Sequence, residues 1–197
     1  MKNRTALLFT ILATAWSVSL SGGDAGNDKT SMNTEWKLPA PDKQGGIPLM
    51  QAVSERKTTR EFKPDTLSEQ TLSDLLYAAC GISHDGKLTI PTALNRQDVI
   101  VYVLLKEKAW KYIPATHSLK AVANADLRRF ATTRPGMGEA GYVSFVIVSD
   151  KSKWNGSASG AKYMPMHAGA VMQQLYLVCA AKKLATLTRQ SEETKEN

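Results

Sequence analysis

The sequence predicts one α+β domain. Of the 197 residues, 43% are hydrophobic and 22% are charged, a composition that argues against wholesale disorder, collagen-like repeats and a disulfide-stapled miniprotein. Helical and strand-like segments follow one another without the strict strand–helix–strand alternation of a parallel sheet, and some of the strands adjoin closely enough to form hairpins. The length suits a single sizeable core.

The first 25 residues resemble a secretory signal peptide. Lys2 and Arg4 precede an uncharged apolar stretch, residues 6–20, which is short for a membrane span and opens into small residues. We expect cleavage after Ala25 and an exported chain, periplasmic or secreted, with no stable membrane anchor. A retained N-terminal anchor is the alternative. No cysteine follows the apolar run, so a lipoprotein anchor is not indicated.

The formal charge of +7 favours anionic partners such as phosphates. Removal of residues 1–25 would take away two positive charges and one negative charge. The basic residues are scattered, with no run of five and no regular interleaving with aromatic residues, so nucleic-acid binding is not expected.

The segment 26–46 is polar and is expected to be a flexible lead-in to a domain at 47–197. A short helix is predicted from Pro48, with an apolar face that includes Val53, followed by a loop over 57–64. A second helix is predicted to begin with a capping box formed by Thr66 and Glu69 and to end at Gly81.

The second half of the chain alternates strands and loops before a long helix. Apolar runs predict strands at 99–105, 110–113, 142–148 and 184–188, with loops at 134–141 and 150–162 and a helix over 166–183. The run at 99–105 is expected to be covered on both faces. Cys80 and Cys179 lie in apolar helical patterns, which favours buried thiols over a disulfide.

Several motifs of known functional sites are incomplete in this sequence. The segment 81–87 is close to a phosphate-binding loop, but Leu88 stands where that loop requires Ser or Thr. Ser54 and Lys57 have serine acyl-enzyme spacing without the companion motifs. His84, His117 and His167 are far apart, so no metal site is expected, and each is interpreted as a surface or loop histidine. We identify no catalytic side chain.

The segment Arg56-Lys-Thr-Thr-Arg60 predicts a phosphate site. Two guanidinium groups and a threonine hydroxyl at the end of a short helix can converge on one phosphate. A solvated charged loop is the alternative for this segment taken alone.

Read with later segments, residues 56–62 resemble the Arg-x-Ser-x-Arg-x-Phe opening of the nitroreductase family of flavin enzymes. The segment 91–97 is similar to the family's Pro-Ser-Ala-x-Asn-x-Gln loop. Residues 169–181 and 184–189 resemble its long late helix and the segment after it. The resemblance covers about Pro48 to Arg189 and implies an α+β fold with a mainly antiparallel sheet flanked by helices.

The resemblance also implies an FMN-dependent oxidoreductase that acts as a homodimer. Arg56, Thr58 and Arg60 would hold the FMN phosphate, with Arg189 as a further contact. The residues that would reach the flavin ring, from the partner subunit, are Pro91, Thr92, Ala93 and Asn95. Family enzymes pass a hydride from NAD(P)H through the flavin to a nitro compound, quinone or similar acceptor. The cofactor carries this chemistry, so no side-chain nucleophile is required.

Two departures from the family pattern leave alternatives open. Thr replaces Ser at positions 58 and 92, and few residues follow Arg189. The chain is therefore also consistent with a degenerate member that binds flavin or another phosphate-bearing ligand without turnover, with a flavin dehydrogenase of the azoline-oxidase type, or with a basic binding module. The sequence does not identify the electron donor or the acceptor.

Overall fold

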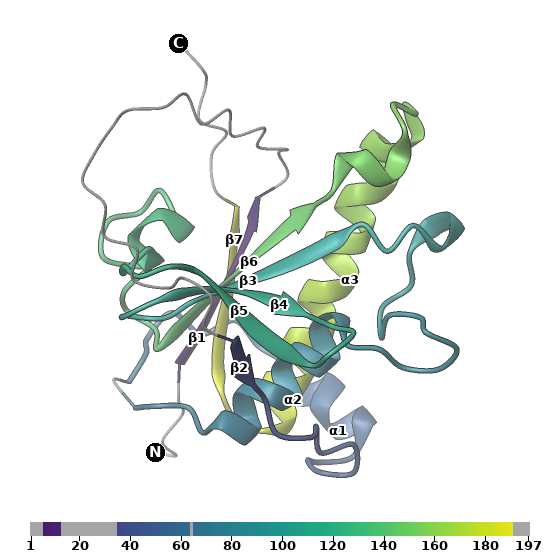
Figure 1. Ribbon diagram of the computed structural model, residues 1–197. Coiled ribbons are helices and arrows are strands. Elements are labelled where there is room, and N and C mark those ends of the chain that lie inside the picture. The colour runs from purple at the N-terminus through teal and green to yellow at the C-terminus, as the bar shows by residue number, and fades with distance from the viewer. Residues whose placement is uncertain (1–5, 13–34, 64, 191–197) are drawn as a thin grey trace, which may run out of the picture.

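The computed structural model describes residues 6–12, 35–63 and 65–190, and within them a single sheet with helices against it (Figure 1). The sheet order is β2 (Glu35–Lys37), β5 (Ser118–Ala123), β4 (Ala109–Ile113), β3 (Val99–Leu104), β6 (Val143–Ser149), β1 (Ala6–Leu12), β7 (Ala185–Gln190). Pairing is antiparallel from β2 to β6, whereas β1 runs parallel to both β6 and β7. The predicted α+β class with a mainly antiparallel sheet is confirmed.

Three α-helices lie on one side of the sheet: α1 (Leu49–Glu55), α2 (Glu69–Cys80) and α3 (Ser159–Ala181) (Figure 1). Alternate residues of β3 and β6, such as Val101 and Phe145, are fully buried and share one core with Leu75 of α2 and Leu175 of α3. On the opposite face, Leu104 packs against a 3-10 helix at Arg128–Ala131. The strand predicted at 99–105 is therefore covered on both faces, as expected.

The predicted helices are present, with two corrections. The residue that caps α2 is Ser68, whose hydroxyl accepts from the Thr71 amide at 3.1 Å, so the expected capping box at Thr66 is wrong. Helix α3 begins at Ser159, well before the predicted start at Met166. A Cβ on Gly160 would lie 2.9 Å from the Trp154 ring, so this glycine allows the first turn of α3 to pack against a buried tryptophan. Strands β1, β2 and β5 are not predicted from the sequence.

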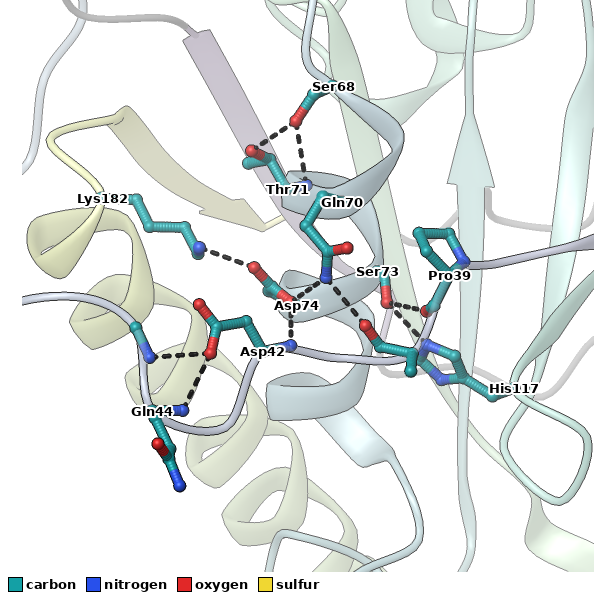
Figure 2. Close-up of polar contacts among 12 residues, drawn as sticks. Pro39, Asp42, Gln44, Ser68, Gln70, Thr71, Ser73, Asp74, His117 and Lys182 are labelled. Carbon is teal, nitrogen blue, oxygen red and sulfur yellow. Dashed lines mark hydrogen bonds and ion pairs between the residues drawn. The ribbon is translucent and has the colours of Figure 1, made fainter.

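The expected lead-in is structured where it is described, because α2 holds it by hydrogen bonds (Figure 2). Ser73 donates to the Pro39 carbonyl at 2.6 Å, and the Asp74 carboxylate accepts from the Asp42 amide at 2.7 Å. Asp74 also pairs with Lys182 at the end of α3, at 2.6 Å. This clamp fixes the chain immediately before α1 and so helps to place the loop that follows α1.

Part of the predicted signal peptide forms strand β1. Residues 6–12, which fall within the predicted signal peptide, form the strand between β6 and β7. The predicted cleavage site at Ala25 lies outside the described residues, so cleavage stays a prediction. A chain cut there would lack β1. Among the described helices, none is both long and apolar enough to cross a bilayer.

Candidate functional site

The loop after α1 is tied to β7. The Thr59 amide donates to the Thr186 carbonyl at 2.8 Å, which places the basic segment 56–60 beside the strand that carries Arg189. Two segments that are far apart in the sequence, both proposed for phosphate binding, therefore meet in the fold.

Arg189 lies in a region of positive charge. Burial lowers the pKa of Arg189, and the positive charges of Arg134 and Arg60 lower it further, so both of these arginines lie within electrostatic reach of Arg189. The Arg189 Nε is buried and has no hydrogen-bond partner among the described residues. Buried donors are almost always satisfied, and a cluster of like charges is stabilised by an anion. The cluster therefore suits a phosphate.

Thr58 is oriented by α3. Its hydroxyl lies 3.1 Å from the hydroxyl of Tyr176, which in turn accepts from the Thr188 amide at 3.0 Å. Tyr176 can therefore donate its own hydrogen to Thr58, which leaves the Thr58 hydrogen available for an anion. The guanidinium of Arg56 lies over the Tyr176 ring, 5.3 Å from its centroid. Tyr176 thus holds two of the predicted phosphate ligands.

The loop containing Pro91, Thr92 and Asn95 has a strained backbone. Leu94, Asn95 and Gln97 all have positive φ values, of 54°, 51° and 47°. For Leu this left-handed conformation costs on the order of 1–2 kcal/mol. The Thr92 carbonyl accepts from the Asn95 amide at 3.1 Å, and the Thr92 hydroxyl accepts from the Gln97 amide at 3.1 Å. The hydroxyl kept at position 92 thus closes the loop.

A buried network supports this loop from α3. The Ala93 amide donates to Nε2 of His167 at 2.8 Å, and Nδ1 of His167 lies 2.7 Å from Oδ1 of Asp98. The other oxygen of Asp98 accepts from Nε1 of Trp154 at 2.8 Å. Asp98 is fully buried and His167 is 4% exposed, so the interpretation of His167 as a surface or loop histidine is wrong. His84, by contrast, is exposed on a loop.

The two groups of predicted residues contact α3 at different points. Thr58, one of the predicted phosphate-binding residues, contacts Tyr176, and the 91–97 loop contacts His167, nine residues earlier and about 14 Å away along the helix axis. A pocket of about 360 Å³ adjoins the loop, lined by residues that include His84, Thr92 and Asn95. The pocket therefore lies beside the residues predicted to reach the flavin ring.

Cys80 and Cys179 are both buried and unbridged, as predicted. No cluster of three metal-ligating side chains occurs among the described residues. Arg134, Tyr176 and Asp98 are not predicted as site residues from the sequence. The only available signal was weak: a lone Asp directly before an apolar strand, and an Arg-Pro-Gly turn in a loop.

Comparison with known sequences decides the family. The sequence model of the nitroreductase family matches residues 53–191. The chain belongs to the nitroreductase family. The family match spans the basic segment, the 91–97 loop, α3 and β7, so both groups of candidate residues lie within it.

Individual relatives agree with this assignment. The chain is 24% identical to "Putative nitroreductase MJ1384" of Methanocaldococcus jannaschii over 169 residues, covering 80% of this chain and 85% of that protein. Its fold is similar to the crystal structure of a putative nitroreductase from Ralstonia eutropha JMP134, with a TM-score of 0.70, 30% identity and coverage of 77% and 74%. A structure from Desulfovibrio desulfuricans, in complex with FMN, shares the fold at a TM-score of 0.50 and 20% identity, with coverage of 71% and 66%.

Proposed function

We propose that this nitroreductase-family protein is an FMN-dependent oxidoreductase. The observation that carries the proposal is the cluster of Arg60, Arg134 and Arg189, in which a buried Nε lacks a partner among the described residues. Such a cluster fits the phosphate of FMN. When bound, FMN would supply hydride-transfer chemistry between NAD(P)H or another donor and a nitro compound, quinone or similar acceptor.

The chain's own residues divide the binding work. Arg60 and Arg189 would neutralise the phosphate, while Thr58 would direct one hydrogen bond to it with its oxygen held by Tyr176. Arg56 would add charge from its position over the Tyr176 ring. Pro91, Thr92, Ala93 and Asn95 would line the flavin ring on a loop whose shape is set by hydrogen bonds.

We further propose a homodimer in which the ring loop comes from the partner subunit. One observation supports it. The large apolar side chains of α1 are exposed, Leu49 to 66% and Met50 to 73%, which suits burial against a second copy.

Flavin titration tests the cofactor. Purified apo protein is titrated with FMN, and quenching of flavin fluorescence is followed. We expect binding at micromolar concentration or tighter, lost in Arg60→Ala/Arg189→Ala and retained in Arg129→Ala, an exposed arginine whose guanidinium lies over the Phe130 ring. If the folded wild-type protein takes up no FMN at micromolar concentration, the proposal fails.

Turnover assays then separate the functional alternatives. The FMN-loaded protein is supplied with NADH or NADPH and a nitroaromatic compound, a quinone or an azoline peptide. Steady donor oxidation that depends on FMN and acceptor supports the reductase, and oxidation of the azoline peptide indicates the reverse direction. Tight FMN binding with no turnover would identify a degenerate, flavin-binding member.

Export of the mature chain, with cleavage after Ala25, remains part of the proposal. Intact-mass analysis of protein recovered from outside the cytoplasm is expected to give a chain that starts at Gly26. Such a chain leaves the facing edges of β6 and β7 without β1 between them. Recovery of the uncut chain would contradict the cleavage proposal and would keep β1 in the sheet.

A further inference from the structure

The loop 91–97 is attached to the core at two points. The Ala93 amide donates to His167, and the guanidinium of Arg96 lies over the Trp154 ring, 5.5 Å from its centroid. Trp154 and His167 stack with their ring centroids 6.1 Å apart. The attachment points are therefore neighbours in a single buried group, and that group does not include the arginine cluster.

The hydrogen bonds select the tautomer of His167. A backbone N–H is always a donor, so Nε2 of His167 must be an acceptor and carry no hydrogen. Nδ1 then carries the hydrogen and donates to Asp98. Asp98 accepts at both oxygens, because the indole N–H of Trp154 is also always a donor. The carboxylate thus selects the imidazole tautomer that can hold Ala93.

We propose that Asp98 and His167 are positioning residues for the 91–97 loop. Asp98 sets the His167 tautomer, His167 fixes the Ala93 amide, and this bond holds the loop in its strained conformation. Strained backbone persists only where surrounding contacts enforce it, and Leu94, at φ 54° and 76% exposed, has little side-chain burial to do so. The consequence for flavin binding rests on the proposed function, whereas the tautomer and the loop conformation do not.

The variant Asp98→Asn tests this relay of hydrogen bonds, from Asp98 through His167 to Ala93, with almost no change in side-chain shape. An amide offers one acceptor oxygen and one donor nitrogen, but Asp98 faces two donors. Trp154 cannot stop donating, whereas His167 can move its hydrogen to Nε2. The side-chain amide nitrogen of the variant is then expected to donate to Nδ1 of His167. In that arrangement Nε2–H faces the Ala93 N–H, and the hydrogen bond between them is lost.

The primary measurement uses apo protein, so it stands whether or not FMN binds. Nitrogen-15 NMR of labelled histidine is expected to show the Nδ1–H tautomer of His167 in wild type and the Nε2–H tautomer in Asp98→Asn. Hydrogen exchange at the Ala93 amide should accelerate about tenfold or more, the equivalent of one lost hydrogen bond, while exchange at the core amide of Val101 stays unchanged. An unchanged tautomer together with unchanged Ala93 exchange would overturn the proposal.

A second pair of variants separates the hydrogen bond from simple packing. His167→Gln keeps an acceptor that can reach Ala93 and is expected to restore much of the Ala93 protection, whereas His167→Phe keeps the stack on Trp154 without any acceptor. Equal Ala93 exchange in the two variants would show that the ring only packs, and would overturn the relay even if Asp98→Asn fails to fold.

FMN binding by Asp98→Asn tests whether these hydrogen bonds affect the candidate site. If wild type binds FMN, Asp98→Asn is expected to bind it about tenfold more weakly. Wild-type FMN binding with equal affinity in Asp98→Asn would overturn the link between loop and cofactor. Absence of FMN binding in wild type would overturn the proposed function but leave the tautomer result intact.

Discussion

Helix α3 contacts two groups of polar residues that are organised in opposite ways. In the group that contacts Tyr176 through Thr58 and Arg56, the charges of Arg60 and Arg134 act on Arg189, and none of these three has an ion pair to a carboxylate among the described residues. Near His167, every hydrogen-bonding atom of the Asp98 carboxylate and the imidazole has a partner. The first group suits an anionic ligand, whereas the second is complete without one. The two groups should therefore respond differently to mutation.

The largest effect on folding is expected in the Asp98–His167 network. Asp98→Ala would leave the buried donors of His167 and Trp154 without their acceptor and should lower the free energy of unfolding by about 3–5 kcal/mol. Urea denaturation of the apo protein measures this change. A loss below about 1 kcal/mol would contradict the view that this network is part of the core.

The largest effect on binding is expected at the arginine cluster. Arg60→Ala/Arg189→Ala removes two charge-assisted contacts to phosphate and should weaken FMN binding on the order of 100-fold or more. Isothermal titration gives the dissociation constants. If FMN binds the double variant as tightly as wild type, its phosphate lies elsewhere.

Salt should weaken the part of FMN binding that depends on the arginine cluster. Raising ionic strength from about 0.05 to 0.5 M shortens the screening length several-fold and is expected to weaken FMN binding by wild type. The same change should have little effect on residual binding by Arg60→Ala/Arg189→Ala. Parallel titrations at several salt concentrations check this, and identical salt slopes for the two proteins would count against the cluster as the phosphate site.

A smaller effect is expected for the stability of the apo protein. Arg189→Ala relieves repulsion from Arg60 and Arg134 and removes a buried, unsatisfied Nε, although it also removes the packing of the side-chain stem. We expect a change within about 1 kcal/mol, against the several expected for Asp98→Ala. Thermal unfolding of the two apo variants side by side measures the contrast.

The smallest effect is expected at Leu94. Leu94→Gly relieves the left-handed strain of about 1–2 kcal/mol but adds flexibility to the unfolded chain, so the net gain in stability should be below about 1 kcal/mol. Urea denaturation detects it. A clear loss of stability would show that the exposed Leu94 side chain makes contacts that compensate for the strain.

The fold was predictable where local patterns dominate. Helix α2 was found from its apolar spacing, and the buried strands from their β-branched runs. The start of α3 was not, because Gly160 and Pro165 are poor local helix signals, and Trp154 packing decides that turn. The short strand β2 was missed because three residues carry no period, and its pairing with β5 is a tertiary contact.

The candidate site divides in the same way. Residue types in a fixed local order carry the family resemblance, and they allow Arg56, Thr58, Arg60, Arg189 and the 91–97 loop to be proposed as site residues from the sequence. Arg134 and Tyr176 could not, since no local pattern distinguishes an arginine that approaches Arg189 from one in solvent. His167 was misread because a histidine in an apolar helix is compatible with either exposure or burial.

The sequence by itself thus determined the α+β class, the family and the order of the candidate ligands, since these depend on residue types and short spacings. Only the tertiary structure decided which of them meet. It tied the basic loop to β7 through Thr59, and it joined Asp98 to Ala93 through His167, across 69 residues between carboxylate and ring. Such contacts depend on the packing of distant elements, which no local pattern records.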